Sequence, residues 1–82
     1  MKIQILGPGC ANCQRLYAQA QMALAETGLE ADLVKVESRP EIEAFGIWVT
    51  PGIAIDGEVK ASGRVASAEE IAAWITEASQ GT

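Results

Sequence analysis

Residues 3–13 read Ile-Gln-Ile-Leu-Gly-Pro-Gly-Cys-Ala-Asn-Cys, and this stretch holds both cysteines of the chain, Cys10 and Cys13. The apolar run predicts a buried strand, the Gly-Pro-Gly segment predicts a turn, and the residues that follow have a helical pattern. A Cys-x-x-Cys sequence at a strand-to-helix junction is typical of a redox-active disulfide. The thiolate is the reactive form of cysteine, and the free N–H groups at a helix N-terminus stabilise it. The sequence therefore predicts that the Cys10 sulfur is accessible and that Cys13 lies close enough to form a disulfide with it.

The residues that follow predict a long helix, a second strand and a short helix. Residues 11–27 carry an apolar stripe, and Gly28 is expected to end that helix in the left-handed conformation. Residues 31–37 are rich in strand-forming side chains. Ser38 and Glu41 predict a capping box for a short helix that extends to about residue 45.

The second half of the chain predicts a hairpin and a last helix. Asp56 and Gly57 separate two short apolar runs, which is the strongest hairpin signal that a sequence offers. The two runs are residues 53–55 and 59–61. Pro51 has no N–H for a sheet ladder, so we expect it at the start of the first of these strands. Residues 67–70 (Ser-Ala-Glu-Glu) predict a capping box for the last helix, and residues 80–82 are expected to fray.

This order of elements, β-α-β-α-β-β-α, predicts an α/β fold with a four-stranded mixed sheet flanked by three helices. The first strand-helix-strand unit should be parallel with a right-handed crossover, and the later hairpin should be antiparallel. We expect all 82 residues to form one domain, because the chain shows no repeat, linker or low-complexity segment.

Composition excludes several classes of function. The formal charge is −5 and the six basic residues are scattered, which argues against a nucleic-acid partner. No run approaches the roughly 18 apolar residues of a membrane helix, and no targeting segment is evident. We therefore expect a cytoplasmic protein. In that reducing compartment, two cysteines indicate catalysis or metal binding more than a structural disulfide.

The whole chain resembles the thioredoxin fold in its minimal form. It is similar to the small, glutaredoxin-sized thioredoxin-like proteins known as redox-active disulfide proteins. Three stretches carry the resemblance: Gly-Pro-Gly-Cys-Ala-Asn-Cys at 7–13, Val-Thr-Pro-Gly-Ile-Ala-Ile-Asp-Gly at 49–57, and Gly63. The pairing of Cys-x-x-Cys with a later Thr-Pro, in the right order of elements, is far more specific than Cys-x-x-Cys alone.

The resemblance implies a protein-disulfide reductase in electron transport, with no cofactor, working as a monomer. Cys10 would attack a disulfide of a substrate protein, and Cys13 would resolve the mixed disulfide. Pro51 would be the cis-proline of the fold, Thr50 would offer its backbone to an extended peptide, and Gly63 would let substrate backbone approach. The electron donor would be similar to thioredoxin reductase.

The active-site loop departs from that of thioredoxins proper. Gly9 stands where they have tryptophan, and Ala11-Asn12 stands where they have Gly-Pro. Gln4 replaces a buried acid that assists the resolving thiol in thioredoxins, so another base or water must serve. No basic cluster flanks the loop, which argues against glutathione as substrate.

Trp48, beside the Thr-Pro pair, has two interpretations. It is either a substrate-contacting aromatic or a partly buried packing residue. Charged side chains are expected to shift the pKa of the Cys10 thiol little. We place Lys35 in mid-strand and Arg15 past the first helical turn. We interpret Glu37 and Asp32 as solvated charges at strand ends, and not as the proton acceptor that would replace the missing acid. Backbone groups and the Cys13 thiol should therefore supply most of the stabilisation of the Cys10 thiolate.

Two alternative functions remain open at this point. The first is a metal-binding module, with Cys10 and Cys13 as ligands of Cu(I) or of a zinc ion shared across a dimer. One chain cannot complete a four-ligand zinc site, because it has no histidine and no third cysteine. The second is a redox-sensing adaptor in which the disulfide alters a binding surface without turnover.

Overall fold

The computed structural model describes residues 1–80 and contains the predicted order of elements. The strands are β1 (Lys2–Leu6), β2 (Asp32–Val36), β3 (Gly52–Ile55) and β4 (Glu58–Ser62). The helices are α1 (Ala11–Thr27), α2 (Arg39–Ala44) and α3 (Ala68–Gln80). Strands and helices begin and end within a residue or two of the expected positions, and the predicted fold class is confirmed.

The sheet has the order β2-β1-β3-β4. β1 is parallel to β2 and antiparallel to β3, and β3 is antiparallel to β4, so the sheet is mixed as predicted. Asp56 and Gly57 both have positive φ (51° and 86°), which is the backbone that a tight hairpin turn between β3 and β4 requires.

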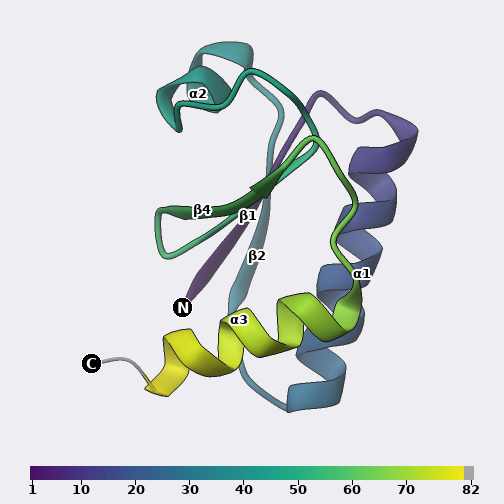
Figure 1. Cartoon of the computed structure of the whole chain (residues 1–82), viewed down its shortest axis with the longest axis vertical. Helices are drawn as coiled ribbons and strands as arrows, with labels where there is room; N and C mark the ends of the chain where they lie inside the picture. Colours follow the sequence, from purple (N-terminus) through teal and green to yellow (C-terminus); the bar gives the residue numbers. More distant parts are fainter. Residues whose placement is uncertain (81–82) are drawn as a thin grey trace.

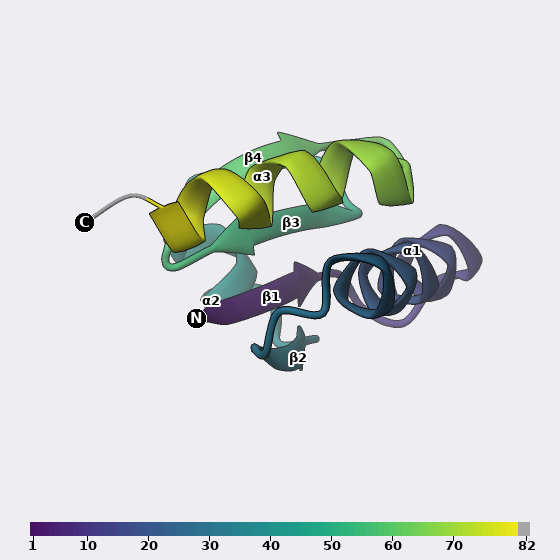
Figure 2. The ribbon, with the colours of Figure 1, turned by 90° about the horizontal axis from the view of Figure 1, so that it is seen from below.

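Side chains alternate between the two faces of the sheet, and helices cover both. On one face, Ile3 and Ile5 of β1 pack in a core with Leu16 of α1 and Ile71 of α3. On the other face, a smaller core places Leu6 against Ile42 of α2, with three further buried residues, Val36, Ile47 and Ala54. The start of α3 lies beside α1 in two perpendicular views (Figures 1 and 2). In Figure 1, α2 lies apart from both. No helix within residues 1–80 is long and apolar enough to cross a membrane.

The ends of the helices agree with the sequence in most places. Gly28 ends α1 with a φ of 69°, and its N–H donates to the Leu24 carbonyl at 3.0 Å. The capping box predicted at Ser38 is wrong, because Ser38 precedes α2 but its side chain makes no capping hydrogen bond. Pro40 in the first turn has no N–H and removes one of the donors that such a cap satisfies. Gln80, which we expected in a frayed tail, is the last residue of α3, and residues 81–82 lie outside the described residues.

The capping box predicted for α3 is present and includes an ion pair. The Glu70 N–H donates to Ser67 Oγ, and the Ser67 N–H donates to Glu70 Oε1, both at 3.2 Å. The Arg64 guanidinium donates to both carboxylate oxygens of Glu70, at 3.0 and 2.8 Å. The hydrogen bonds from Arg64, and next that from Ser67, lower the pKa of Glu70 to about 2.

We expect Glu70→Gln to remove a pH-dependent part of the stability. The ordinary carboxyl pKa is 4.5 and that of Glu70 is about 2 in the folded protein. The stabilisation is therefore complete above the higher value and is lost as pH falls toward the lower one. At neutral pH the variant should be slightly less stable than the parent, because the pair is half-exposed. Urea unfolding at a series of pH values should show the two proteins converging in acid, and a difference that persists at the lowest pH would contradict this account. Glu69→Gln, which leaves the pair intact, is the matched control.

Candidate functional site

The two cysteines form a disulfide at the N-terminus of α1. Cys10 is the N-cap residue with extended backbone, and its sulfur accepts a hydrogen bond from the Cys13 N–H at 3.2 Å. The two Cα atoms are 5.0 Å apart. Cys10 is exposed, whereas Cys13 is only 5% exposed. The helix N-terminus thus presents one sulfur to solvent, stabilised by a backbone donor, and places the other beneath it.

Gly7, the first residue after β1, packs directly against Cys13. A Cβ atom at Gly7 would overlap the Cys13 sulfur and would lie 3.7 Å from the Thr50 Cβ. The Gly7 N–H donates to the Val36 carbonyl at 2.9 Å, which holds the turn to the end of β2. Sequence reasoning assigned Gly7 only to a turn and missed this contact, because it depends on how α1 folds back over the end of β1.

Thr50 and Pro51 lie next to the disulfide. Leu6 of β1 pairs with Gly52 of β3, so the turn after β1 and the segment before β3 meet at one end of the sheet. The Thr50–Pro51 peptide bond is cis, and Pro51 is buried. Gly63, which follows β4, donates its N–H to the Pro51 carbonyl at 2.8 Å. Gly63 has a φ of 79°, and a Cβ there would come within 2.9 Å of Val49. The structure thus brings together the disulfide, the Thr-Pro pair and Gly63.

Trp48 and Val49 are exposed beside this site. The exposed fraction is 84% for Trp48 and 58% for Val49, so the interpretation of Trp48 as a partly buried packing residue is wrong. Trp48 borders a small pocket of about 80 Å³ that also touches Pro8 and Thr50. A large aromatic side chain that is exposed to solvent near a disulfide is available to contact another molecule.

The remaining residues of the active-site loop are exposed. Gly9 has a φ of 90°, and its carbonyl accepts a hydrogen bond from the Gln14 side chain at 3.3 Å. Ala11 lies in the first turn of α1, next to Asn12, whose side-chain Oδ1 accepts a hydrogen bond from the Arg15 guanidinium at 3.4 Å. Arg15 is therefore directed toward the outer side of the first turn.

A hollow of about 250 Å³ lies on the β2 side of the disulfide, and sequence reasoning missed it. Its walls include Gly7, Gly9 and Cys13, together with Lys35 and Glu37. The Lys35 ammonium lies over the Tyr17 ring, 4.8 Å from its centroid. Because β1 and β2 are parallel, their carboxyl ends meet at the same edge of the sheet, and this was the signal that could have placed Lys35 and Glu37 near the cysteines.

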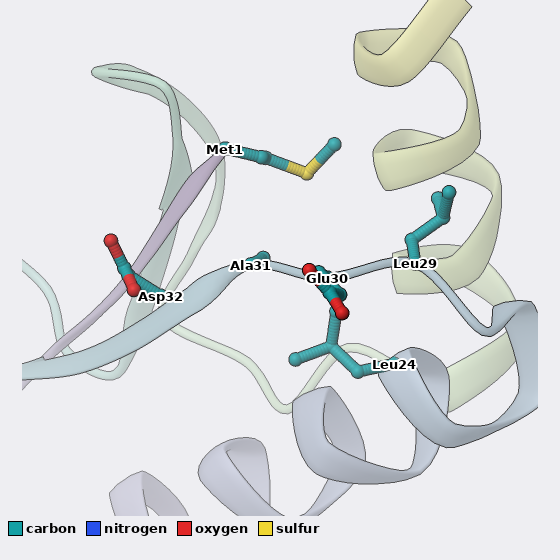
Figure 3. A pocket seen from close by; sticks show the side chains of 6 residues that line it. All are labelled: Met1, Leu24, Leu29, Glu30, Ala31 and Asp32. Atoms are coloured by element: carbon teal, nitrogen blue, oxygen red, sulfur yellow. The ribbon is translucent and has the colours of Figure 1, made fainter.

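A larger hollow lies at the opposite end of β1. It has a volume of about 560 Å³ and is lined by Met1, Leu24, Leu29, Glu30, Ala31 and Asp32. The side chains of Met1 and Leu29 extend toward α3 (Figure 3). This hollow contains no cysteine, and none of its lining side chains is cationic. Within residues 1–80, no three side chains of His, Cys, Asp or Glu gather as metal ligands.

Comparisons with known proteins identify a family model and relatives that match most of this chain. Residues 1–76 match the family model described as a thioredoxin domain. A thioredoxin of Methanothermobacter thermautotrophicus is 51% identical over 71 residues, which is 87% of this chain and 92% of the relative. A thioredoxin of Methanocaldococcus jannaschii is 39% identical over 69 residues, which is 84% of this chain and 79% of the relative.

Proposed function

The chain belongs to the thioredoxin family and is a thiol–disulfide oxidoreductase, and from this premise we propose that it reduces disulfides in other proteins through Cys10 and Cys13. The observation that carries the proposal is the unequal exposure of two bonded sulfurs at a helix N-terminus. Only Cys10 is accessible to a protein-sized substrate. The backbone N–H of Cys13, 3.2 Å from the Cys10 sulfur, is placed to stabilise a thiolate there after reduction.

The proposed cycle has two exchange steps. In the reduced protein, the Cys10 thiolate attacks one sulfur of the substrate disulfide, and the other substrate sulfur leaves as a thiolate that takes up a proton. Cys13 then loses its proton and attacks the Cys10 sulfur. The Cys10–Cys13 bond forms, the bond to the substrate breaks, and the second substrate thiol is released. The substrate gains two electrons and the protein dithiol loses two, so an external donor must reduce the protein again.

The surface around the disulfide supports binding of an extended segment of the substrate. Thr50 and Pro51 lie beside the cysteines, and Gly63 offers approach without a side chain. We assign Trp48 to substrate contact, because its exposed ring borders the same surface. We further propose that the protein works as a cytoplasmic monomer with a donor similar to thioredoxin reductase. One chain carries both cysteines, and a dithiol persists in reducing compartments.

Trapping of mixed disulfides tests this function. In Cys13→Ser the first step can occur but the second cannot, so the reduced variant should accumulate adducts with disulfide-containing proteins through Cys10. Cys10→Ser keeps the buried thiol but lacks the accessible nucleophile, and it should form none. Non-reducing electrophoresis and mass spectrometry of the linked peptides would measure both results. Absence of adducts from both variants would contradict the proposed function.

A further inference from the structure

In the resolving step Cys13 needs a proton acceptor, and the buried core does not supply one. Thiolates, not thiols, attack disulfides, so Cys13 must lose a proton before it can resolve the mixed disulfide. Cys13 is 5% exposed, and no polar or charged side chain is buried within residues 1–80. Gln4, half-buried in β1, has an amide that cannot accept a proton at neutral pH. A proton acceptor therefore has to reach Cys13 from the surface.

The hollow on the β2 side of the disulfide offers such an approach. Cys13 forms part of its wall, and Glu37 supplies the one carboxylate among its lining residues. The Glu37 Oε2 atom lies 3.1 Å from the position that a Cβ of Gly9 would occupy. Gly9 thus leaves the space in which this carboxylate sits against the active-site loop. At about 30 Å³ per water molecule, a volume of about 250 Å³ has room for several waters between the carboxylate and the thiol.

The other charged groups around the hollow are compatible with this role. Lys35 is the one cation among the residues that line the same hollow, and its ammonium lies over the Tyr17 ring of α1. Arg15 of α1 is directed toward Asn12 instead. On the far side of Glu37, Arg39 and Glu43 line the neighbouring small pocket with it, but neither lines the hollow that contains Cys13.

We propose that Glu37 is the proton acceptor for Cys13 in the resolving step. This inference rests on the proposed function. The Cys13 thiol gives its proton to the Glu37 carboxylate through water in the hollow, and the resulting thiolate attacks the Cys10 sulfur. The new Cys10–Cys13 bond replaces the bond between Cys10 and the substrate, and the substrate sulfur leaves with the electron pair of that bond. Glu37 then returns its proton to solvent.

The two steps can be timed separately with an aromatic disulfide reagent. One equivalent of 5,5′-dithiobis(2-nitrobenzoic acid) reacts with the reduced protein and releases a first coloured thiolate when Cys10 attacks. It releases a second when Cys13 resolves the adduct. Stopped-flow absorbance should show that Glu37→Gln leaves the first phase unslowed. The second phase should be about tenfold slower at neutral pH, less than the usual general-base effect, because a small fraction of the thiol is already ionised there.

The pH profile of the second phase distinguishes proton transfer from a structural effect. With a carboxylate acceptor, the rate should change little between about pH 6 and pH 8, because a carboxylate is ionised and a thiol is mostly protonated across that range. In Glu37→Gln it should instead rise about tenfold per pH unit in that range, because only prior ionisation of the thiol remains. The matched control is Glu43→Gln, which removes a carboxylate from the neighbouring pocket and should behave like the parent in both phases.

A second phase that is unchanged in Glu37→Gln would overturn the proposal. A faster second phase would also overturn it, because it would mean that the carboxylate opposes thiolate formation. Either result leaves the proposed function intact, since both thiolates are still released in sequence. Failure of the proposed function has a different signature, namely a parent protein that releases no second thiolate.

Discussion

Leu16→Ala is expected to lower the free energy of unfolding by about 2–5 kcal/mol, the range for a fully buried leucine. Leu16 has no exposed surface and lies in α1, one turn after Cys13, in the core that joins the helix to β1 and α3. The loss combines the transfer energy of the missing methyl groups with the cavity that they leave. Because small domains are only marginally stable, a large part of the folded population should be lost on mild heating.

Urea unfolding of the parent and the variant would measure this loss. Met22→Ala is the matched control, because Met22 lies in the same helix but is 50% exposed. Its effect should stay within about 0.5 kcal/mol. A cost for Leu16→Ala as small as that of the control would show that α1 does not depend on this core contact.

Gly7→Ala is expected to cost about 1–3 kcal/mol, the usual range for overpacking, and to slow disulfide exchange. The backbone of Gly7 is not in the left-handed region, so an alanine is acceptable there for the main chain itself. The obstacle is space, since the added Cβ would overlap the Cys13 sulfur and lie 3.3 Å from the Cys13 Cβ. Either Cys13 or the turn must shift, and either shift would change the position of the turn relative to the disulfide.

A double-mutant cycle with Cys13→Ala identifies the contact responsible. All four proteins should be unfolded in urea under reducing conditions, so that none carries a disulfide. When the Cys13 sulfur is absent, Gly7→Ala should cost less than about 0.5 kcal/mol, and the coupling energy should make up most of its cost in the parent. An equal cost in both backgrounds would falsify the assignment of this strain to Cys13.

The sequence alone determined the features that depend on neighbouring residues. Gly28 ends α1, Asp56-Gly57 turns the hairpin, and Ser67 with Glu70 begins α3, as expected. Each of these signals acts over a few residues, through backbone conformation or a local hydrogen bond, so the chain carries it wherever the segment lies. The Cys-x-x-Cys pair belongs to the same class, since a helical turn brings its two sulfurs together.

Only the tertiary structure decided which distant side chains meet at the site. From the sequence, Trp48 is either a substrate-contacting aromatic or a partly buried packing residue. Its exposure depends on how the segment between α2 and β3 leaves the sheet. At the N-terminus of α3, the Ala68 N–H donates a hydrogen bond to Oε1 of Gln19, which lies 49 positions earlier in the chain. No local sequence pattern indicates this contact. Lys35 and Glu37 read as a mid-strand and a strand-end charge, yet parallel pairing of β1 with β2 brings both to the hollow beside Cys13. These contacts arise from strand order, register and helix packing, which depend on the burial of apolar surface across the whole chain and not on any single segment.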